Sequence, residues 1–421
     1  MKIIAPVRSC LGSLGRRKLA WFGILSIAAL AVRFGCAQYI GSEYDMGAFS
    51  NWAIGSRSFA FLGYYSFFDH PHLSFPNYAL YFPILALMGN AAQVTTAAGR
   101  ILLKTPGMLG DIFLAGIVFC AAKPRWRMPA AAFVLFNPAI WYDSTIFGQT
   151  DSLHTAFMVL AVLCAAKNKY RFAWMSLAAA VFFKLQAIAI LPLIVALNFK
   201  ASGFKKMTVE LAPAAILTAI MTLPYAIVSS PAIIWRSFKG SFGMFPLVAI
   251  NAWNPWYLFH MLAGRWVYDT ETAFGISYKT IGLIAFALAA AAIVYALPKR
   301  PGRMIIFAAA AAMSLAFFML PTEMHERYAY SFIPLVAVLL SESPLVVCLA
   351  AAASLAIFLD MNFVQKMPIL DLSFVNTVNG RAAWSVIFVA TFVAYSVWYF
   401  RRARAEKQGK TAPGTTRLMA K

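Results

Sequence analysis

The chain is poor in charged residues. Only 12% of its 421 residues are Asp, Glu, Lys or Arg, whereas 62% are hydrophobic. A soluble globular protein carries about a quarter charged residues, because polar groups must cover its surface. The composition therefore excludes a soluble enzyme, a disordered chain and a collagen-like fibre. It predicts an all-α polytopic membrane protein.

Cysteines and nucleotide-binding motifs are also scarce. The five cysteines are scattered, and no C-x-x-C occurs, so neither a disulfide framework nor a zinc site is indicated. The sequence has no P-loop, no G-x-S-x-G and no dinucleotide fingerprint. No cytoplasmic segment is large enough to bind a nucleotide sugar. We therefore expect any transferred group to arrive on a lipid.

Acidic residues are much less common than basic ones: the chain has 36 Lys and Arg and 15 Asp and Glu, which gives a net charge of +21. Such a balance would suit nucleic acid in a soluble protein, but no recognition motif supports that partner. Membrane topology explains the excess, because short cytoplasmic loops collect Lys and Arg. We expect a lipid bilayer as partner and no nucleic acid.

Six basic clusters, taken as cytoplasmic, define the predicted topology. They are Arg16-Arg17-Lys18, Lys123/Arg125/Arg127, Lys167/Lys169/Arg171, Lys200/Lys205/Lys206, Lys299/Arg300/Arg303 and Arg401/Arg402/Arg404. Because every segment between two consecutive clusters must leave the cytoplasm and return, it holds an even number of crossings. This predicts about 12 transmembrane helices with both termini cytoplasmic. The predicted runs are 19–40, 102–122, 128–142, 152–166, 172–184, 187–199, 208–228, 280–297, 304–320, 328–341, 344–360 and 382–400.

This topology divides the chain into a cytoplasmic segment 1–18, a transmembrane domain 19–400 and a basic cytoplasmic tail 401–421. We expect the first apolar run to remain as a span, because no clear signal-peptide cleavage site follows it. Two long non-cytoplasmic loops, about 41–100 and 229–279, should carry short interfacial helices. Within the first, 78–98 predicts an interfacial or re-entrant helix; the alternative is a thirteenth span.

Most carboxylates fall on the non-cytoplasmic side of this topology. The eleven acids are Glu43, Asp45, Asp69, Asp143, Asp151, Asp269, Glu271, Glu323, Glu326, Asp360 and Asp371. Acids contribute little to orientation, so their concentration predicts that the chemistry lies there. The alternative is that outer loops simply need polar residues.

The first candidate motif follows the first span. Asp45, with Glu43 beside it, lies among aromatic side chains at a membrane exit, an environment that suits a general base. Trp52 is two helical turns further on and could stack on a sugar. Asp69 is a rival base, and capping of a helix by Asp45 is the alternative interpretation. Arg33, within the span, needs a partner or an anion.

Two further motifs lie in the middle of the chain. Gln149 and Asp151 share a tight turn at Gly148 that suits a sugar or phosphate, although Asp151 could instead cap the next helix. Lys184 follows a long apolar stretch, and an intramembrane lysine is a candidate for binding a lipid-linked phosphate. Snorkelling to the interface is the alternative.

The last motifs lie beyond residue 250. Glu323-Met324-His325-Glu326-Arg327-Tyr328 joins two apolar runs, where His325 and Arg327 could neutralise a phosphate and Glu326 could orient Arg327. Its spacing does not match H-E-x-x-H, so no metal is argued from it. Asn254, between two tryptophans, suits a carbohydrate or a simple interfacial anchor.

In order and position these motifs resemble the GT-C glycosyltransferases, and most of all bacterial relatives of the second GPI mannosyltransferase. The resemblance rests on Glu43-Tyr44-Asp45 with Trp52, Gln149-Thr150-Asp151-Ser152, Phe183-Lys184-Leu185-Gln186 and Met324-His325-Glu326-Arg327-Tyr328. It implies a polyprenyl-phosphate sugar donor, inversion at the anomeric carbon and Asp45 as base. The acceptor would be lipid-linked, a glycan or a protein.

The residue roles follow from this resemblance together with the motifs. We expect Asp45 and Glu43 in catalysis. The donor phosphate is expected at Lys184, Arg327, His325, Arg33 and Lys104. Sugar or acceptor is expected at Trp52, Asp69, Gln149, Asp151, Gln186, Asn254, Glu326 and Tyr328. No cofactor is required, with Mg²⁺ or Mn²⁺ at the outer acids as the alternative.

The expected protein is thus a multi-pass hexosyltransferase of the inner membrane, with its active site facing the periplasm. One alternative is a polysaccharide polymerase or ligase that uses lipid-linked glycans. The other is a lipid or solute transporter without catalysis. A transporter would favour mid-helix charges and two similar halves, whereas only Asp111 is clearly mid-span and no duplicated half is visible.

Overall fold

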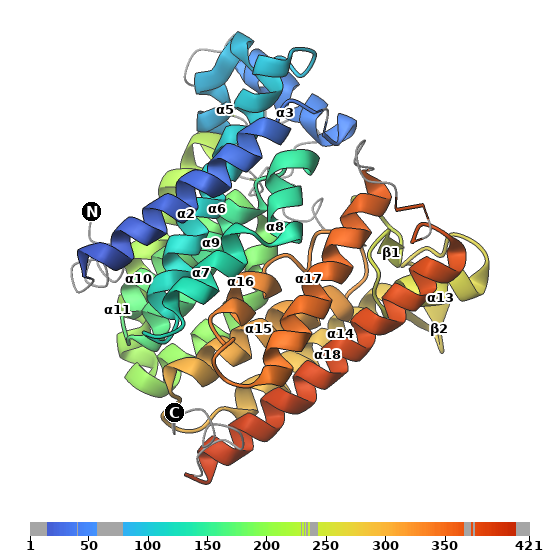
Figure 1. Ribbon diagram of the computed structural model, residues 1–421. Coiled ribbons are helices and arrows are strands. Elements are labelled where there is room, and N and C mark those ends of the chain that lie inside the picture. The colour runs from blue at the N-terminus through green and yellow to red at the C-terminus, as the bar shows by residue number, and fades with distance from the viewer. Residues whose placement is uncertain are drawn as a thin grey trace.

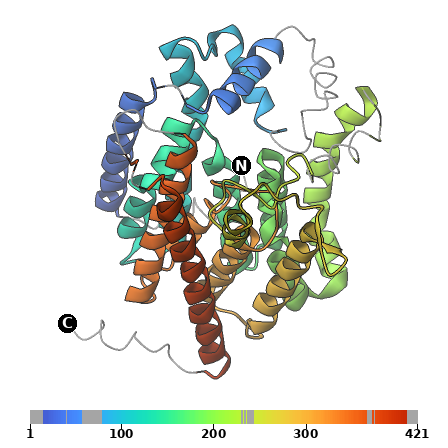
Figure 2. The same ribbon diagram turned by 90° about the vertical axis from the view of Figure 1, so that its right-hand side faces the viewer.

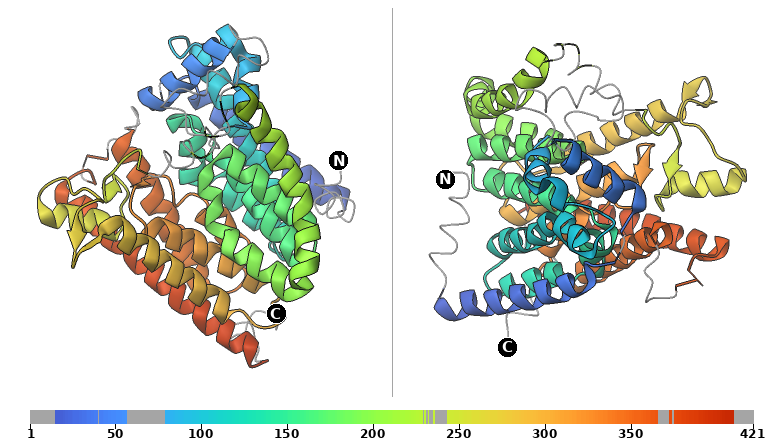
Figure 3. Two further views of the ribbon diagram at one scale, coloured as in Figure 1. Left: turned by 180° about the vertical axis from the view of Figure 1, so that it is seen from behind. Right: turned by 90° about the horizontal axis from the view of Figure 1, so that it is seen from above.

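The computed structural model describes residues 15–39, 41–56, 79–228, 230, 232, 235, 243–365, 372–373 and 375–409. Within these residues the fold consists of helices with two very small sheets. Figure 1 shows two groups of helices, the N-terminal half in blue to green and the C-terminal half in yellow to red. The view from behind separates the same two groups (Figure 3).

The N-terminal region consists of α2 (Arg16–Cys36), α3 (Glu43–Ser56), α5 (Phe82–Met88), the 3₁₀ turn η1 (Gly89–Ala91) and α6 (Ala97–Ala121). Helices α3 and α5 cover one end of the molecule, at the top of Figures 1 and 2. They share a small aromatic core, in which the ring centroids of Phe49 and Tyr81 are 5.4 Å apart. With 7 residues, α5 is far too short to cross a bilayer, and residues 57–78 before it lie outside the described part.

The middle of the chain forms a packed helical hairpin and its neighbours. Its elements are α7 (Arg127–Leu135), α8 (Pro138–Tyr142), η2 (Asp143–Phe147), α9 (Asp151–Ala166), α10 (Tyr170–Phe183), η3 (Leu185–Ile190) and α11 (Leu191–Val228). The single helix expected over 128–142 is divided, because Pro138 restricts the residue before it and Asn137 caps α8. Within α11, Gly203 has φ of 71°, which breaks the helix between two of the expected runs.

The C-terminal half begins with a small β region. Its elements are β1 (Ala249–Ile250), α13 (Pro255–Ala263), β2 (Thr272–Ala273), β3 (Ile276–Ser277), α14 (Tyr278–Ala296), α15 (Arg303–Met319), β4 (Met324–His325), α16 (Phe332–Ala337), α17 (Pro344–Val364) and α18 (Val378–Lys407). Strand β1 pairs in parallel with β4, so the second long loop is attached to the segment that carries the His325–Arg327 motif.

Among the described residues, six helices are long and apolar enough to cross a membrane. They are Arg16–Cys36, Ala97–Ala121, Leu185–Leu223, Tyr278–Ala296, Pro344–Val364 and Val378–Lys407. The prediction of a polytopic helical membrane protein is thereby confirmed. Each of the twelve predicted runs contains helical residues, but several are short, and the count of twelve stays a prediction.

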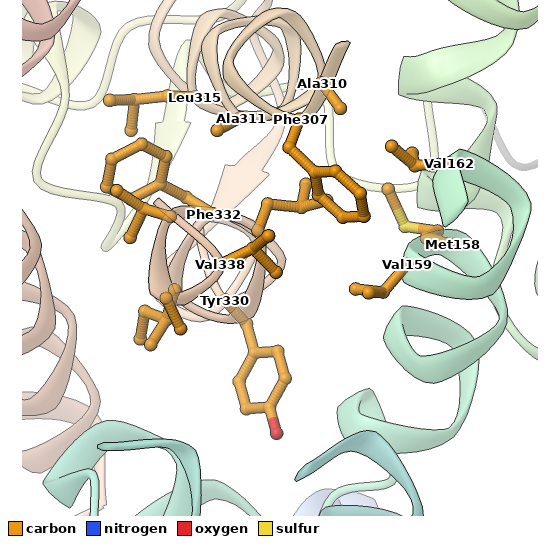
Figure 4. Close-up of a cluster of buried hydrophobic side chains, with 14 of the residues drawn as sticks. Met158, Val159, Val162, Phe307, Ala310, Ala311, Leu315, Tyr330, Phe332 and Val338 are labelled. Atoms are coloured by element: carbon orange, nitrogen blue, oxygen red, sulfur yellow. The ribbon is translucent and has the colours of Figure 1, made fainter. Parts of the chain in front are cut away.

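The apolar core joins the two groups of helices. In Figure 4, Met158 and Val162 of α9 face Phe307 and Ala310 of α15, and all four side chains are buried. The segment that contains α16 lies between these two helices, and the ring of its Phe332 is fully buried. This packing fixes the end of the loop that precedes α16, which is where the candidate site lies.

The two ends of the molecule differ in what they carry. The first residues of α2 lie at the left of Figure 1 and the last residues of α18 at its lower left, whereas α3 and α5 lie at the top and α13 at the right. Figure 2 shows the same separation of α3 and α5 from the end of α18. The expected loops and the expected basic termini therefore lie at opposite ends.

Candidate functional site

Asp45 lies in the first turn of α3 with its carboxylate available. Ser42 precedes the helix, and its hydroxyl oxygen accepts a hydrogen bond from the Asp45 backbone N–H at 3.4 Å. The Ser42 N–H in turn donates to the Phe147 carbonyl at 3.0 Å. Because Ser42 takes the capping position, Asp45 does not serve as the cap of α3. Its side chain remains 21% exposed.

The turn between α8 and α9 is a π-helical segment, a form often found at functional sites. It ends at Gly148, whose φ of 87° suits glycine. A Cβ added to Gly148 would lie only 2.3 Å from the Met46 sulfur, so α3 and this turn touch. Asp143, at the start of the turn, is fully buried. Because Gly148 has no side chain, α3, which carries Asp45, can lie close to the turn that carries Asp143.

Asp151 is the first residue of α9, and the N-cap position is held by Thr150, whose side chain makes no capping hydrogen bond. The Asp151 carboxylate forms an ion pair with the ammonium group of Lys184. Lys184 has extended backbone between α10 and η3, which turns its side chain away from the course of either helix. Both side chains are almost completely buried. The lysine therefore does not snorkel to a surface.

Arg327 is held by the loop between α15 and α16. Parallel pairing aligns Ala249 with Met324 and Ile250 with His325, and the Glu323 N–H donates to the Leu247 carbonyl at 3.1 Å. This backbone contact with the second long loop fixes the strand two residues before Arg327. The loop then returns to the bundle at α16.

Arg327 joins these segments into one cluster. Its guanidinium lies 3.6 Å from the Asp45 carboxylate, 4.0 Å from that of Asp151 and 2.5 Å from that of Glu326. The guanidinium carbon also lies 5.1 Å from the centre of the Phe147 ring, within cation–π range. We call the residues Asp45, Asp151, Lys184, Glu326 and Arg327 the Arg327 cluster.

The two basic residues of the Arg327 cluster act on the acids around them. Burial raises the pKa of Glu326, but the Arg327 charge and a hydrogen bond with His325 outweigh it and bring the pKa to about 2. Glu326 is therefore ionised at neutral pH. Burial, reinforced by the Asp151 charge, raises the pKa of Asp143 well above its usual range. Lys184 and Arg327 thus lie among the carboxyl groups of Asp45, Asp151 and Glu326.

Several other predicted residues surround the cluster. The Tyr328 ring centre lies 5.7 Å from the Lys184 ammonium, and the rings of Tyr328 and His325 are 5.0 Å apart. Gln149 is fully buried, and Gln186 is partly buried beside Lys184. Lys104 reaches the same turn, because a Cβ at Gly148 would lie 3.4 Å from its side chain.

Other predicted residues have different partners. The Arg33 Nε donates to Asp111 at 2.7 Å, and Asp111 also accepts from Ser144 at 2.6 Å. Because Ser144 belongs to η2, this buried pair supports the η2 turn. The Lys104 ammonium donates to the Tyr39 carbonyl at 2.8 Å. The use of Arg33 as the partner of Asp111 favours a supporting role over direct contact with a donor.

The last group of predicted residues consists of Asn254, Trp52, Glu43 and Asp69. Asn254 caps α13 and donates to the Phe318 carbonyl at 3.0 Å, so its amide is used within the fold. Trp52 packs on Phe82, with ring centres 5.1 Å apart. Glu43 is exposed on α3, and Asp69 lies outside the described residues.

Sequence reasoning did not assign Asp143, Phe147 or His154 to the site. Asp143 was recognised only as one of many outer acids. The His154 Nδ1 lies 3.8 Å from the Asp151 carboxylate, one helical turn along α9. That i, i+3 spacing was a signal that could have found it. Nothing in the sequence places the Phe147 ring beneath Arg327, because that contact depends on the η2 turn.

No group of three or more His, Cys, Asp or Glu side chains in the described residues is arranged to hold a metal ion. The acids of the Arg327 cluster are instead interleaved with cations. The prediction about Mg²⁺ or Mn²⁺ is left for experiment.

No protein-family model matches the chain, and no curated protein matches it. A similar solved structure is the crystal structure of ArnT from Cupriavidus metallidurans bound to undecaprenyl phosphate. The two chains are 12% identical, with a TM-score of 0.47, over 93% of this chain and 78% of that one. At this level of similarity, function has to be argued from this chain's own residues.

Proposed function

We propose that this protein is a membrane glycosyltransferase of the GT-C type. In this proposal it moves a hexose, mannose-like or glucose-like, from a polyprenyl-phosphate donor to an acceptor hydroxyl. The reaction takes place at the non-cytoplasmic face of the inner membrane. The observation that carries the proposal is the Arg327 cluster, in which a partly exposed carboxylate, Asp45, lies 3.6 Å from a buried guanidinium.

The cations of the cluster suit a phosphodiester at a membrane surface. Lys184 and Arg327 are held in place by Asp151 and Glu326, so their positions are set before a donor binds. A guanidinium offers a fork of N–H donors, and an ammonium offers a compact charge. Both come from segments next to apolar helices, where a polyprenyl chain can remain in lipid.

Asp45 suits the role of general base. Its carboxylate is the most exposed of the three in the cluster, at 21% compared with 1% for Asp151 and 2% for Glu326. An acceptor hydroxyl can therefore reach it, whereas the deeper acids are already engaged with cations. General-base catalysis contributes typically about 10²–10⁴-fold to a rate.

The proposed step balances without a cofactor. The acceptor oxygen forms a bond to the anomeric carbon while its proton passes to Asp45. The bond from that carbon to the phosphate oxygen breaks, and the electron pair leaves with the polyprenyl phosphate. This direct displacement inverts the anomeric centre. The leaving group departs as a stable anion near Lys184 and Arg327, so no separate acid is needed.

Donor choice tests the proposal. Purified full-length protein in lipid is given polyprenyl-phosphate mannose, glucose or arabinose together with a mixture of glycolipid acceptors, and products are measured by mass. We expect one donor to yield a product heavier by one sugar, with activity retained in EDTA. Transfer of a whole glycan from a polyprenyl pyrophosphate, or transport without a new glycosidic bond, would contradict the proposal.

A further inference from the structure

Buried polar atoms without a partner are concentrated in and around the Arg327 cluster. In the part of the chain that the structure describes, both carboxylate oxygens of Asp143 and both amide atoms of Gln149 have no hydrogen-bond partner. The same holds for Asp151 Oδ2, His154 Nδ1 and Arg327 Nε. Leaving a buried polar group unpaired is destabilising, more so for a charged group, so such a concentration indicates that something else binds these atoms.

Two of the unpaired atoms face each other across a gap. Arg327 Nε is a donor, Asp151 Oδ2 is an acceptor, and they are 4.0 Å apart. That separation is too long for a hydrogen bond. A hydroxyl oxygen placed between them can accept from Nε and donate to Oδ2. On the other side of the carboxylate, His154 Nδ1 is 3.8 Å from Asp151 Oδ1, again just beyond hydrogen-bond distance.

The His154 ring is held so that this nitrogen faces the acid. Its Nε2 lies 3.3 Å from the Thr155 hydroxyl and 3.4 Å from that of Ser331. The ring therefore joins α9 to the segment before α16, and Nδ1 is left towards Asp151. The η2 turn carries Asp143 close enough to Asp151 and Arg327 for their charges to act on it. The backbone carbonyl of Asp143 accepts the N–H groups of Gly148 and Gln149 at 2.9 Å each, which fixes the turn.

We infer that Asp143, Gln149, Asp151, His154 and Arg327 form a subsite for the hydroxyl groups of the transferred sugar. This inference rests on the proposed function and assigns Asp143 and His154 to it for the first time. A sugar hydroxyl both donates and accepts, which matches a set of atoms that contains acceptors, a donor and an amide with both. The reacting carbon then lies between this buried subsite and the more exposed Asp45.

The chemistry favours a hydroxyl-rich ring over a second anion. Asp143 and Asp151 would meet an anion with oxygen atoms, and Lys184 already pairs with Asp151. A neutral ring can instead be bound without changing the charge of a buried site. A site built to bind hydroxyl groups rejects analogues that lack them, because its own polar atoms are then left unpaired.

The experiment separates the sugar from its lipid phosphate. Binding of bare polyprenyl phosphate and of the polyprenyl-phosphate sugar chosen in the donor panel is measured on full-length protein in nanodiscs. The ratio of the two affinities gives the contribution of the sugar alone. Two near-isosteric variants are compared with wild type: Asp143→Asn, and Gln149→Met, which removes the amide while keeping the side-chain length.

We expect each variant to reduce the sugar's contribution about three- to tenfold, the size of one net hydrogen bond, with affinity for bare polyprenyl phosphate unchanged. Ser176→Ala is the matched control, because Ser176 also has a buried hydroxyl without a partner among the described residues but lies within α10. This control should leave both affinities unchanged.

The possible failures are distinguishable. If wild-type protein binds neither ligand and transfers no sugar, the proposed function falls together with the inference. If wild type prefers the sugar-bearing donor and both variants keep that preference, the subsite is wrong while the enzyme class stands. Equal loss of affinity for both ligands would place these residues in the phosphate site, and would overturn the inference.

Discussion

Two groups of charged side chains, built from the same residue types, behave differently in this molecule. The second group, which we call the Glu342 cluster, contains Lys123, Glu342, Arg402 and Glu406. Glu342 pairs with Lys123 at 2.7 Å and with Arg402 at 3.4 Å, and Arg402 pairs with Glu406 at 3.2 Å. Each charge there meets an opposite charge, and Lys123 is 38% exposed to solvent.

The Arg327 cluster is more deeply buried and less completely paired. Its two cations come from different segments: Lys184 pairs directly with Asp151, whereas the Arg327 guanidinium lies 3.6 Å from Asp45 and 4.0 Å from Asp151. The Glu342 cluster joins the ends of helices, since it ties the chain after α6 to α18. Glu342 Oε1 also has no hydrogen bond, but the Lys123 ammonium lies 2.7 Å from it. The difference teaches that several buried polar atoms left without a close partner, and not charge itself, distinguish a candidate binding site from a structural tie.

Helix α6 runs between the two clusters. Its 25 residues extend about 37 Å at 1.5 Å per residue, more than the roughly 30 Å hydrocarbon thickness of a bilayer. Lys104, near the Arg327 cluster, lies in its first half, and Lys123 follows its last residue. The two clusters should therefore face opposite compartments.

The largest expected contrast is in accessibility. A single cysteine at Ser42, beside Asp45, should be labelled by a membrane-impermeant reagent from outside, whereas one at Asn168 should be labelled only after permeabilisation. The physical reason is that basic loops stay cytoplasmic. The background must lack the five native cysteines. Labelling of both sites from outside, or the reverse pattern, would contradict the topology.

The next largest effect concerns turnover. Asp45→Asn keeps the shape of the side chain but cannot accept the acceptor's proton, so we expect turnover to fall about 10²–10⁴-fold. Donor affinity and expression should change little. Glu43→Gln is the matched control on the same turn and should be mild, as should Asp69→Asn. Near-normal turnover in Asp45→Asn with loss in either of the other variants would assign the base elsewhere.

A smaller effect is expected on donor binding. Lys184→Met should weaken binding of a polyprenyl-phosphate sugar about tenfold to a hundredfold, the range of a hydrogen bond to a charged group. Because the change also leaves Asp151 buried without its cation, the double variant Lys184→Met with Asp151→Asn restores charge balance. If donor affinity equals wild type in the single variant, Lys184 does not bind the phosphate.

The smallest effect is expected at the Glu342 cluster. Glu342→Gln removes a carboxylate from two ion pairs, and solvent screens the Lys123 side. We expect a loss of about 1–2 kcal/mol of stability, seen as a melting point lower by a few degrees. Turnover per folded molecule should equal wild type. A fall in turnover without a change in melting temperature would remove the distinction between the two clusters.

Much of the site could be predicted from the sequence because charged residues are rare in apolar chains. Asp45, Asp151, Lys184, Glu326 and Arg327 were all identified by that criterion, and the structure brings all five together. The same criterion could not separate Arg33 from them. Its partner, Asp111, lies 78 positions away in the chain, and such pairing depends on how α2 packs against α6.

Composition and charge spacing by themselves determined that this chain is helical, crosses a membrane repeatedly and collects acids in a few loops, because the cost of burying charge in lipid acts on each residue locally. Tertiary structure alone decided that Ser42 replaces Asp45 as a cap, that the η2 turn buries Asp143, and that Arg327 reaches Asp151 without closing a hydrogen bond. Those outcomes depend on distances between segments far apart in the chain, and only packing sets such distances.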